Sequence, residues 1–543
     1  MVSSAYDLGT PQLVASTEDD MKRPRLIYYN DAHHFHGKRM EPPASIHMLE
    51  WPVNEIAGTG VDLLAIGLGY ADVYFHQSKV GRVVGQQKEV WENYIDWRIM
   101  RMVEEAAEKG TDQLREVIRR GRETGIRVFP SIKLQDGSVR YGERCGSLKW
   151  ERGKEVCIAE EGKNEWAYDY ANKDVREYKL AMIREVLEDY EADGIELDYK
   201  FGGAYFKSSE GDNGTSIMNA FVAEVKELAT QIGQKQGREI GVMARADLLR
   251  DVNLSMNLDV EQWLKDGLLD YVVGQDPYVV SETNVDQAWL PDAANANNAA
   301  AYYRPPRRVY DERVGLPSIE MYRALNQSLI SAGWTGQYHG YLLWPFADRE
   351  YQMLRELAHP EVHVRSPKRY LVQPREGVLG EPTTTPHRQV PVDLVEGETA
   401  KVNLSIADDI DSAKADGEMR KPILTIRFSY FCIEDEYEIR FNGETLPLDE
   451  FEITDERGLE MRVRLAGSMS VQAPAGMSAH WFRSKLPIDL VRRGDNLVEV
   501  EMKKFEPRAG FTRSINGVEV LMRYKDMQRP EGFDVERMAP LSA

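Results

Sequence analysis

The stretch DGIELDYK, residues 193–200, decides the fold that this sequence predicts. It follows an amphipathic run at 175–190 and precedes a glycine pair, so we expect a short buried strand that feeds a turn. Side chains alternate between the two faces of a strand, so Glu196, Asp198 and Lys200 share one face and the apolar residues share the other. Charges on a buried face are costly unless they are paired or solvated in a cavity. We therefore predict a functional site here, and an internal ion-pair network is the alternative.

Strand-like and helical patterns alternate on both sides of this stretch. The expected strands are 25–30, 61–69, 125–133, 193–200, 240–247, 269–276, 307–312 and 340–346. The expected helices between them are 91–121, 174–190, 216–232, 259–266 and 318–331. About eight strand–helix units predict an α/β fold of the (β/α)8 TIM-barrel type. A doubly wound sheet is the alternative, but no glycine-rich phosphate turn follows the first strand.

The hydropathy pattern of the sequence changes beyond about residue 360, where apolar and polar residues alternate in short runs. These runs are 423–428, 437–441, 461–465, 497–502 and 518–522, and turns such as Asn442-Gly443 separate them. The pattern predicts an all-β sandwich, jelly-roll-like, after the barrel. The predicted division is a flexible segment at 1–22, a catalytic barrel at 23–360, a linker at 361–390 and an accessory sandwich at 391–543.

Composition limits the kinds of partner. The 543 residues are too many for one core, and 42% of them are hydrophobic. A formal net charge of −21, with no long Lys/Arg run, argues against a nucleic-acid or anionic-membrane partner. Neither an export signal nor an apolar window of about 18 residues is apparent. The three cysteines have no metal-ligand spacing and favour a reducing compartment, although a Cys145–Cys157 bridge is an alternative. We expect a cytoplasmic protein, without excluding export or a homo-oligomer.

The site of a (β/α)8 enzyme is built at the C-terminal ends of the strands. The residues expected there combine carboxylates, imidazoles, cations and aromatic rings, a mixture that suits a carbohydrate. The catalytic candidates are Asp198, Glu196, Asp247 and Asp276. The substrate-binding candidates are Asp31, His33, His34, His36, Tyr70, Asp72, Lys133, Tyr199, Lys200, Arg245, Gln275, Tyr278 and Trp344.

Glycosidic cleavage needs one carboxylic acid to protonate the leaving oxygen and a second carboxylate as nucleophile or base. Glu196 and Asp198 have Cα atoms about 6.6 Å apart on an ideal strand, but they lie along its axis and need not flank a bond. A pair of Asp198 with Asp247 or Asp276, on neighbouring strands, is therefore equally consistent. In the alternative, Glu196 lies deeper and only orients Asp198 or Arg245.

A histidine cluster follows the first expected strand. On an extended segment His34 and His36 fall on one face, where they could bind a metal together with Asp31. No second His/Glu motif supports a metal, so we predict neither a metal nor another cofactor. Hydrogen bonding to a sugar is the preferred interpretation, and a structural loop is the alternative. Trp344 is expected to stack on a sugar or to pack in the core.

Two segments resemble the glycosyl-hydrolase-like family 10 barrels: 193–199 and the run LDVEQWLKDGLLDYVVGQ at 258–275. The resemblance covers about residues 24–350 and implies a (β/α)8 protein with a glycoside-cleaving site at the ends of strands four to six. The segments at 439–446 and 490–500 are similar to the jelly-roll accessory domains of such enzymes.

The fourth expected strand also resembles the DGxDxDxE signature of family-18 chitinases, with one departure. Lys200 occupies the position of the terminal glutamate that acts as general acid, so the chitinase mechanism does not carry over. We expect Lys200 to pair with Asp198 and to favour the ionised carboxylate.

Several functions remain open. The leading hypothesis is a glycoside hydrolase acting on an oligo- or polysaccharide, and the cations Lys133, Lys200 and Arg245 suggest an acidic one. The alternatives are a non-catalytic carbohydrate-binding barrel and a polysaccharide lyase with Lys, Tyr or His as base. A Schiff-base enzyme using Lys200 is a further alternative.

Overall fold

In the computed structural model, the described residues are 23–70, 72–86, 89–135, 145–160, 165–200, 203–276, 283, 289–306, 317–342, 344–374, 389–455 and 479–525. Among them, eight parallel strands close into a barrel in the order β1-β10-β9-β8-β7-β6-β5-β2. Their bounds are β1 Leu26–Asn30, β2 Leu63–Gly67, β5 Arg127–Lys133, β6 Gly194–Asp198, β7 Gly241–Asp247, β8 Tyr271–Gln275, β9 Ala300–Arg304 and β10 Gly336–Gly340. The predicted (β/α)8 fold is confirmed.

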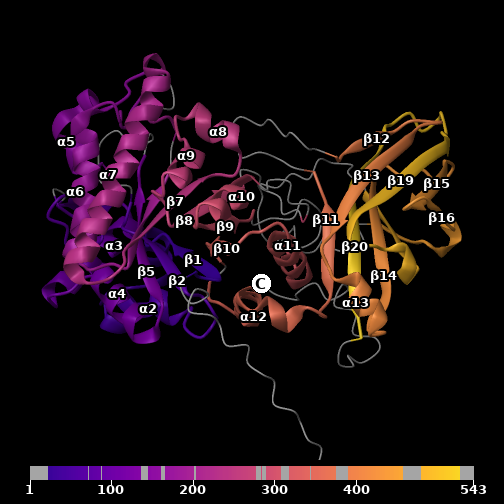
Figure 1. Cartoon of the computed structure of the whole chain (residues 1–543), viewed down its shortest axis with the longest axis horizontal. Coiled ribbons are helices and arrows are strands. Elements are labelled where there is room, and N and C mark those ends of the chain that lie inside the picture. Colours follow the sequence, from indigo (N-terminus) through magenta and orange to yellow (C-terminus); the bar gives the residue numbers. More distant parts are fainter. Residues whose placement is uncertain are drawn as a thin grey trace, which may run out of the picture.

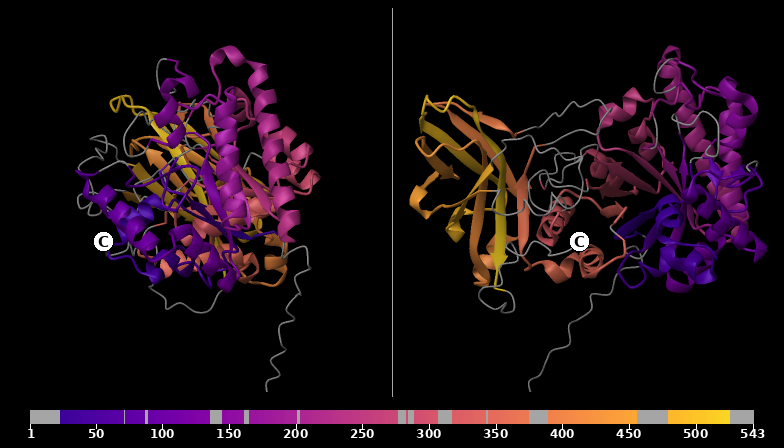
Figure 2. Two further views of the ribbon diagram at one scale, coloured as in Figure 1. Left: turned by 90° about the vertical axis from the view of Figure 1, so that its left-hand side faces the viewer. Right: turned by 180° about the vertical axis from the view of Figure 1, so that it is seen from behind.

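Helices surround the barrel on its outer side (Figures 1 and 2). They are α1 His33–Arg39, α2 Ile46–Asn54, α3 Tyr94–Glu108, α4 Gln113–Thr124, α5 Ser147–Arg152, α6 Lys173–Glu188, α7 Asp212–Gln236, α8 Arg250–Ser255, α9 Val260–Lys265, α10 Trp289–Ala296, α11 Ile319–Ser331 and α12 Asp348–Ala358. The short strands β3 (Val73–Tyr74) and β4 (Arg82–Val83) pair after β2. No helix of the described residues has the length and apolar character that a membrane span requires.

Three sequence predictions about the barrel are wrong. The single helix expected at 91–121 is two helices, because Gly110 has a φ of 75° and the Asp112 side chain caps α4. The seventh strand is β9 (Ala300–Arg304), whereas 307–312 lies outside the described residues. The eighth strand is β10, which ends at Gly340, where the expected strand begins. The glycines and polar residues of GQYHG concealed β10 from a search for apolar runs.

An aromatic ring fills the lower part of the barrel. Phe129 of β5 points inward beside Met243 and Tyr271, and it belongs to a buried cluster inside the strands. Glycines on the next two strands make room for it, because a Cβ on Gly194 or Gly241 would overlap its ring. The lower half is therefore a closed core, and polar chemistry is confined to the upper end.

The C-terminal part is a sandwich of two antiparallel sheets, as predicted. One sheet has the order β11-β20-β14-β18-β17, with β12 also paired to β20, and the other has the order β13-β19-β15-β16. The bounds of the first are β11 Lys368–Val372, β12 Val392–Leu394, β14 Met419–Ser429, β17 Glu452–Asp455, β18 Ala479–Lys485 and β20 Arg513–Tyr524. Those of the second are β13 Thr399–Ile406, β15 Glu436–Phe441, β16 Glu444–Leu446 and β19 Gly494–Lys504. A short helix, α13 (Ile410–Ala415), follows β13.

The barrel and the sandwich lie at opposite ends of the long axis, with α11 and α12 between them (Figures 1 and 2). Helix α11 packs against β11, and Ala324 of α11 belongs to the sandwich core. β11 falls within the segment that we expected to be a linker. It is a strand because it pairs with β20 and so joins the sheet.

The Asn442-Gly443 turn joins β15 and β16, and both residues have positive φ. The strand expected at 461–465 lies outside the described residues.

Candidate active site at the C-terminal end of the barrel

Strand β6 presents two carboxylates to the interior of the barrel. Ile195, Leu197 and Tyr199 belong to the core between the strands and the outer helices, whereas Glu196 and Asp198 face Arg245 of β7. The alternation predicted for 193–200 is therefore observed. Glu196 and Asp198 are both fully buried. Such a pair in a barrel interior needs compensating charge, and β7 supplies it.

Two ion pairs cross between β6 and β7. The Arg245 guanidinium donates to both oxygens of Asp198, with an Nε–Oδ1 distance of 3.2 Å. The Lys200 ammonium reaches the other way and lies 2.6 Å from Oδ2 of Asp247. The expectation that Lys200 pairs with Asp198 is wrong for its side chain; only its backbone N–H donates to Asp198, over 2.9 Å. Each of these two carboxylates thus has its own cationic partner.

Glu196 lies one layer deeper than Asp198 and is poorly compensated. In register, Glu196 aligns with Ser131, and Asp198 aligns with Lys133 at the end of β5. Neither Glu196 oxygen has a hydrogen-bond partner among the described residues, and Arg245 Nε lies 3.9 Å from Oε1. Burial therefore raises the pKa of Glu196, while Arg245 opposes that rise.

Hydroxyl groups around Glu196 are also unsatisfied. The side-chain oxygens of Ser131, Tyr29 and Tyr338 are buried without a hydrogen-bond partner in the described part of the chain. Ser131 and Tyr338 lie close enough to lower the pKa of Glu196 in part, although neither has hydrogen-bond geometry. The Arg245 guanidinium stacks over the Tyr29 ring at 4.6 Å and over the Tyr338 ring at 5.5 Å. The cation is thus fixed between two rings.

The chain turns sharply at the end of β1. Ala32 has a φ of 56°, and the predicted extended histidine segment is instead helix α1. The expectation that His34 and His36 share one face is therefore wrong. His36 is buried in the opposite direction, where its Nδ1 lies 3.1 Å from the Ala32 carbonyl and burial lowers its pKa to about 4. His34 contacts the Asp31 carboxylate through both its backbone N–H and its imidazole.

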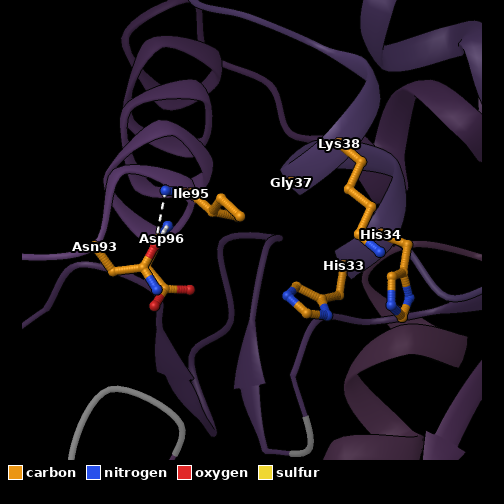
Figure 3. Close-up of a pocket in the computed structure, with 7 residues that line it drawn as sticks. All are labelled: His33, His34, Gly37, Lys38, Asn93, Ile95 and Asp96. Carbon is orange, nitrogen blue, oxygen red and sulfur yellow. Dashed lines mark hydrogen bonds between the residues drawn. The ribbon is translucent and has the colours of Figure 1, made fainter. Parts of the chain in front are cut away.

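A small pocket with a volume of about 120 Å³ opens beside these histidines (Figure 3). His33, His34, Gly37 and Lys38 line one side of it, and Asn93, Ile95 and Asp96 from the start of α3 line the other. Tyr70 connects the two sides, because its ring lies 4.8 Å from that of His33 and its hydroxyl donates to Asp96. The Lys133 ammonium donates to the Tyr70 carbonyl over 3.1 Å.

Other predicted site residues lie apart from this group. The Asp72 carboxylate pairs at 2.6 Å with Lys179 of α6, so it faces the helices. The Tyr199 hydroxyl contacts the Met218 sulfur, in the outer core. Asp276 accepts from the Tyr303 hydroxyl over 2.6 Å.

Three predicted residues remain. Gln275 ends β8 in register with Asp247 and with Arg304. Trp344 is 41% exposed and lies 5.5 Å from the Arg39 guanidinium. Tyr278 lies outside the described residues.

Several residues at the mouth were not predicted. Arg304 ends β9, and Tyr29, Ser131 and Tyr338 face inward below the mouth. Tyr341 follows β10 and packs at 5.5 Å against both Tyr29 and His34, and burial raises its pKa to about 12. The short apolar and aromatic run at 300–303, which ends at Arg304, could have located this strand end; for the others the sequence carries no comparable signal.

No protein-family model matches the sequence, and no curated protein is significantly similar to it. The resemblance to the glycosyl-hydrolase-like family 10 therefore stays a prediction. Among solved structures, the α-L-fucosidase isoenzyme 2 of Paenibacillus thiaminolyticus matches with 14% identity and a TM-score of 0.40, over 64% of this chain and 51% of that one.

Two further solved structures are similar. A cycloisomaltooligosaccharide glucanotransferase of Paenibacillus sp. gives 10% identity and a TM-score of 0.34, over 93% of this chain and 58% of that one. The maltogenic α-amylase AmyB of Thermotoga neapolitana gives 10% identity and a TM-score of 0.36, over 72% of this chain and 87% of that one. The chain spans little more than half the length of the first two. These values are too low to transfer an activity to this chain.

Proposed function

We propose that this protein is a glycoside hydrolase whose reaction takes place between the ends of β6 and β7. The observation that carries the proposal is the crossed arrangement of Asp198 with Arg245 and of Asp247 with Lys200. It supplies two inward-facing carboxylates on neighbouring strands, each with its own cation. Glycosidic cleavage by the usual route requires two carboxyl groups that approach one sugar from different positions.

The spacing of the two strands suits this chemistry. Asp198 aligns with Arg245, and Asp247 lies two residues further along β7. A strand spacing of about 4.8 Å and a rise of about 6.6 Å for two residues separate the two Cα atoms by about 8 Å. The carboxyl groups can therefore reach the separations of roughly 5–9.5 Å used by retaining and inverting enzymes.

The contacts suggest different roles for the two carboxylates. Asp198 is held by a rigid guanidinium that is itself fixed between two tyrosine rings, so it suits the carboxylate that stabilises or attacks the positively charged transition state. Oδ2 of Asp247 is held by the flexible side chain of Lys200, and its Oδ1 accepts from the Leu249 backbone N–H over 2.8 Å. Movement of this ammonium would free Asp247 to exchange a proton with the leaving group.

Both carboxylates are fully buried, so a substrate must open the site. Displacement of the Lys200 ammonium would uncover the Asp247 carboxylate, and the several rotatable bonds of lysine permit such a movement. Lys200 and Arg245 already have anionic partners, so they are not free to bind a uronate. We therefore propose a neutral oligosaccharide as substrate, in preference to the acidic one that the sequence suggested.

The test compares two buried aspartates, each paired with a lysine at 2.6 Å. Asp247→Asn alters the pair inside the barrel mouth, and Asp72→Asn alters the equally buried pair with Lys179 that faces α6. Both substitutions should destabilise the fold by similar amounts, because each removes a buried ion pair between an aspartate and a lysine. Turnover of a neutral oligosaccharide should fall by roughly 10²–10⁴-fold in Asp247→Asn alone.

Product analysis on a broad panel of oligosaccharides comes first and decides between the classes of function. Hydrolysis gives new reducing ends. An unsaturated product with ultraviolet absorbance would instead identify a lyase, and calorimetric binding without any product would identify a carbohydrate-binding barrel. Either result, or full turnover in Asp247→Asn, would contradict the proposed hydrolase.

A further inference from the structure

We propose that Asp31, His33 and His34 form a binding site for one divalent first-row transition-metal ion beside the barrel mouth. One imidazole nitrogen of each histidine and one carboxylate oxygen of Asp31 all lie within 4.8 Å of one another. Bonds of about 2.0–2.2 Å to a metal place its ligand atoms roughly 3–4 Å apart. Shifts of about an ångström or less, within the reach of small side-chain rotations, would close the triad on an ion.

The backbone brings the three side chains together. The sequence suggested His34 and His36 as the pair, but the turn at Ala32 starts helix α1 at His33 and sends His36 into the core. The Asp31 carboxylate is held at this turn by the His34 backbone N–H, over 2.9 Å. The same carboxylate contacts Nδ1 of the His34 imidazole, a place where a divalent ion can substitute for the bridging proton.

The surroundings leave coordination positions open. Asp31 is buried with a side-chain exposure of 6%, whereas His34 is 45% exposed, so the triad has a closed side and an accessible side. The accessible side faces the 120 Å³ pocket (Figure 3). Asn93 and Asp96 lie across that pocket and offer oxygen atoms to a water molecule or hydroxyl bound to the metal.

The donor set selects the class of ion. Two imidazoles and one carboxylate suit Zn²⁺, Co²⁺, Ni²⁺ or Fe²⁺, whereas Mg²⁺ and Ca²⁺ prefer oxygen donors alone. Lys38 lines the same pocket, and Lys133 contributes a positive potential at Asp31. These two cations should weaken binding relative to a site without them. The site shares no residue with the Asp198–Asp247 pair, so the inference does not depend on the proposed hydrolase.

The test uses the full-length protein after treatment with a chelator and dialysis, with Co²⁺ as the probe. We expect visible absorbance bands that saturate at one equivalent, and loss of those bands when Zn²⁺ is added but not when Mg²⁺ is added. His34→Ala, His33→Ala and Asp31→Asn should each weaken Co²⁺ binding by at least about 10–100-fold. His47→Ala is the control, because His47 is an exposed histidine of the neighbouring helix α2 and should leave binding unchanged.

Stability is measured on the same variants, so that loss of binding is separated from loss of fold. His34 is half exposed, so His34→Ala should still fold cooperatively, with a melting temperature lowered only by loss of the Asp31 contact, and should lose the increase that Zn²⁺ causes in the parent. Absence of saturable Co²⁺ bands in the parent would overturn the proposal. Equal affinities in His34→Ala and His47→Ala would also overturn it.

Discussion

Two buried arginine–aspartate pairs, one in the sandwich and one in the barrel, differ in how completely their polar atoms are satisfied. In the sandwich, Arg513 pairs with Asp435 at 2.8 Å, and neither side chain is exposed. Arg513 also donates to backbone carbonyls, including that of Phe511 at 2.6 Å, and Asp435 also accepts from the Tyr437 hydroxyl and the Glu506 backbone N–H, both over 2.8 Å. This network is closed.

In the barrel, Arg245 and Asp198 are equally buried, but the groups beneath them are not satisfied. The Glu196 carboxylate is a second anion, 3.9 Å from Arg245, and it has no hydrogen-bond partner among the described residues. The Tyr338 hydroxyl has no hydrogen-bond partner among them either. A protein that only needed a stable core would gain by replacing such groups with apolar ones. Their presence at the C-terminal end of a barrel supports our proposal that this layer serves a ligand or a reaction.

The largest expected difference comes from removing the aspartate of each pair. Asp198→Asn should lower turnover of a neutral oligosaccharide by at least about 10³-fold, because it removes the anion proposed to face the transition state. Asp435→Asn should leave turnover per folded molecule unchanged and lower the free energy of unfolding by about 3–5 kcal/mol. Steady-state kinetics on both variants measure turnover, and urea unfolding measures the free energy of unfolding.

The stability of Asp198→Asn refines this comparison. Glu196 can take over part of the charge of Arg245, whereas Asp435 is the one ion-pair partner of Arg513 in the described part of the chain. We therefore expect Asp198→Asn to destabilise the protein less than Asp435→Asn does. The reverse order would show that the barrel pair is the structural one.

A smaller effect concerns the pH dependence of stability. Burial raises the pKa of Glu196 above its ordinary value of 4.5, so the folded protein holds this proton after the unfolded chain has lost it. Stability should then fall as pH rises from about 4.5 through the raised pKa, by about 1.4 kcal/mol for each unit by which the pKa is raised. Glu196→Gln cannot ionise and should lack this decline. Urea unfolding at a series of pH values measures it.

Glu519 of the sandwich is the matched control for Glu196. It is buried and pairs with Arg369 at 2.9 Å, so Glu519→Gln should destabilise the protein near neutral pH by removing this buried ion pair. If Glu196→Gln destabilises to the same degree near neutral pH, Glu196 is ionised and paired, and the barrel layer is as closed as that of the sandwich.

The inward direction of Glu196 and Asp198 could be predicted because strand alternation is a local property of the chain. The partner of Lys200 could not, because it depends on the register between β6 and β7, which brings Asp247 to it from 47 positions away. The sandwich strands were predictable in the same way from alternation, as with 497–502 in β19.

The predicted extended conformation of the histidine cluster was wrong for a different reason. One residue, Ala32 with a φ of 56°, changes the following segment from extended to helical, and alanine gives no signal for positive φ. β10 was missed because its inward residue Tyr338 stands among Gly336, Gln337 and Gly340, which resemble a turn. The strand forms because tertiary pairing with β1 and β9 overrides that local preference.

The smallest expected effect comes from deleting one hydroxyl in each network. The Tyr437 hydroxyl donates to Asp435 over 2.8 Å, so Tyr437→Phe should lower the free energy of unfolding by about 1.5–3 kcal/mol. The Tyr338 hydroxyl has no partner among the described residues, so Tyr338→Phe should stay within about 0.5 kcal/mol of the parent. Both substitutions keep the ring, so cavity terms cancel. An equal loss in the two variants would mean that ordered water satisfies Tyr338, and the open character of the barrel layer would then belong to solvent that a substrate must displace.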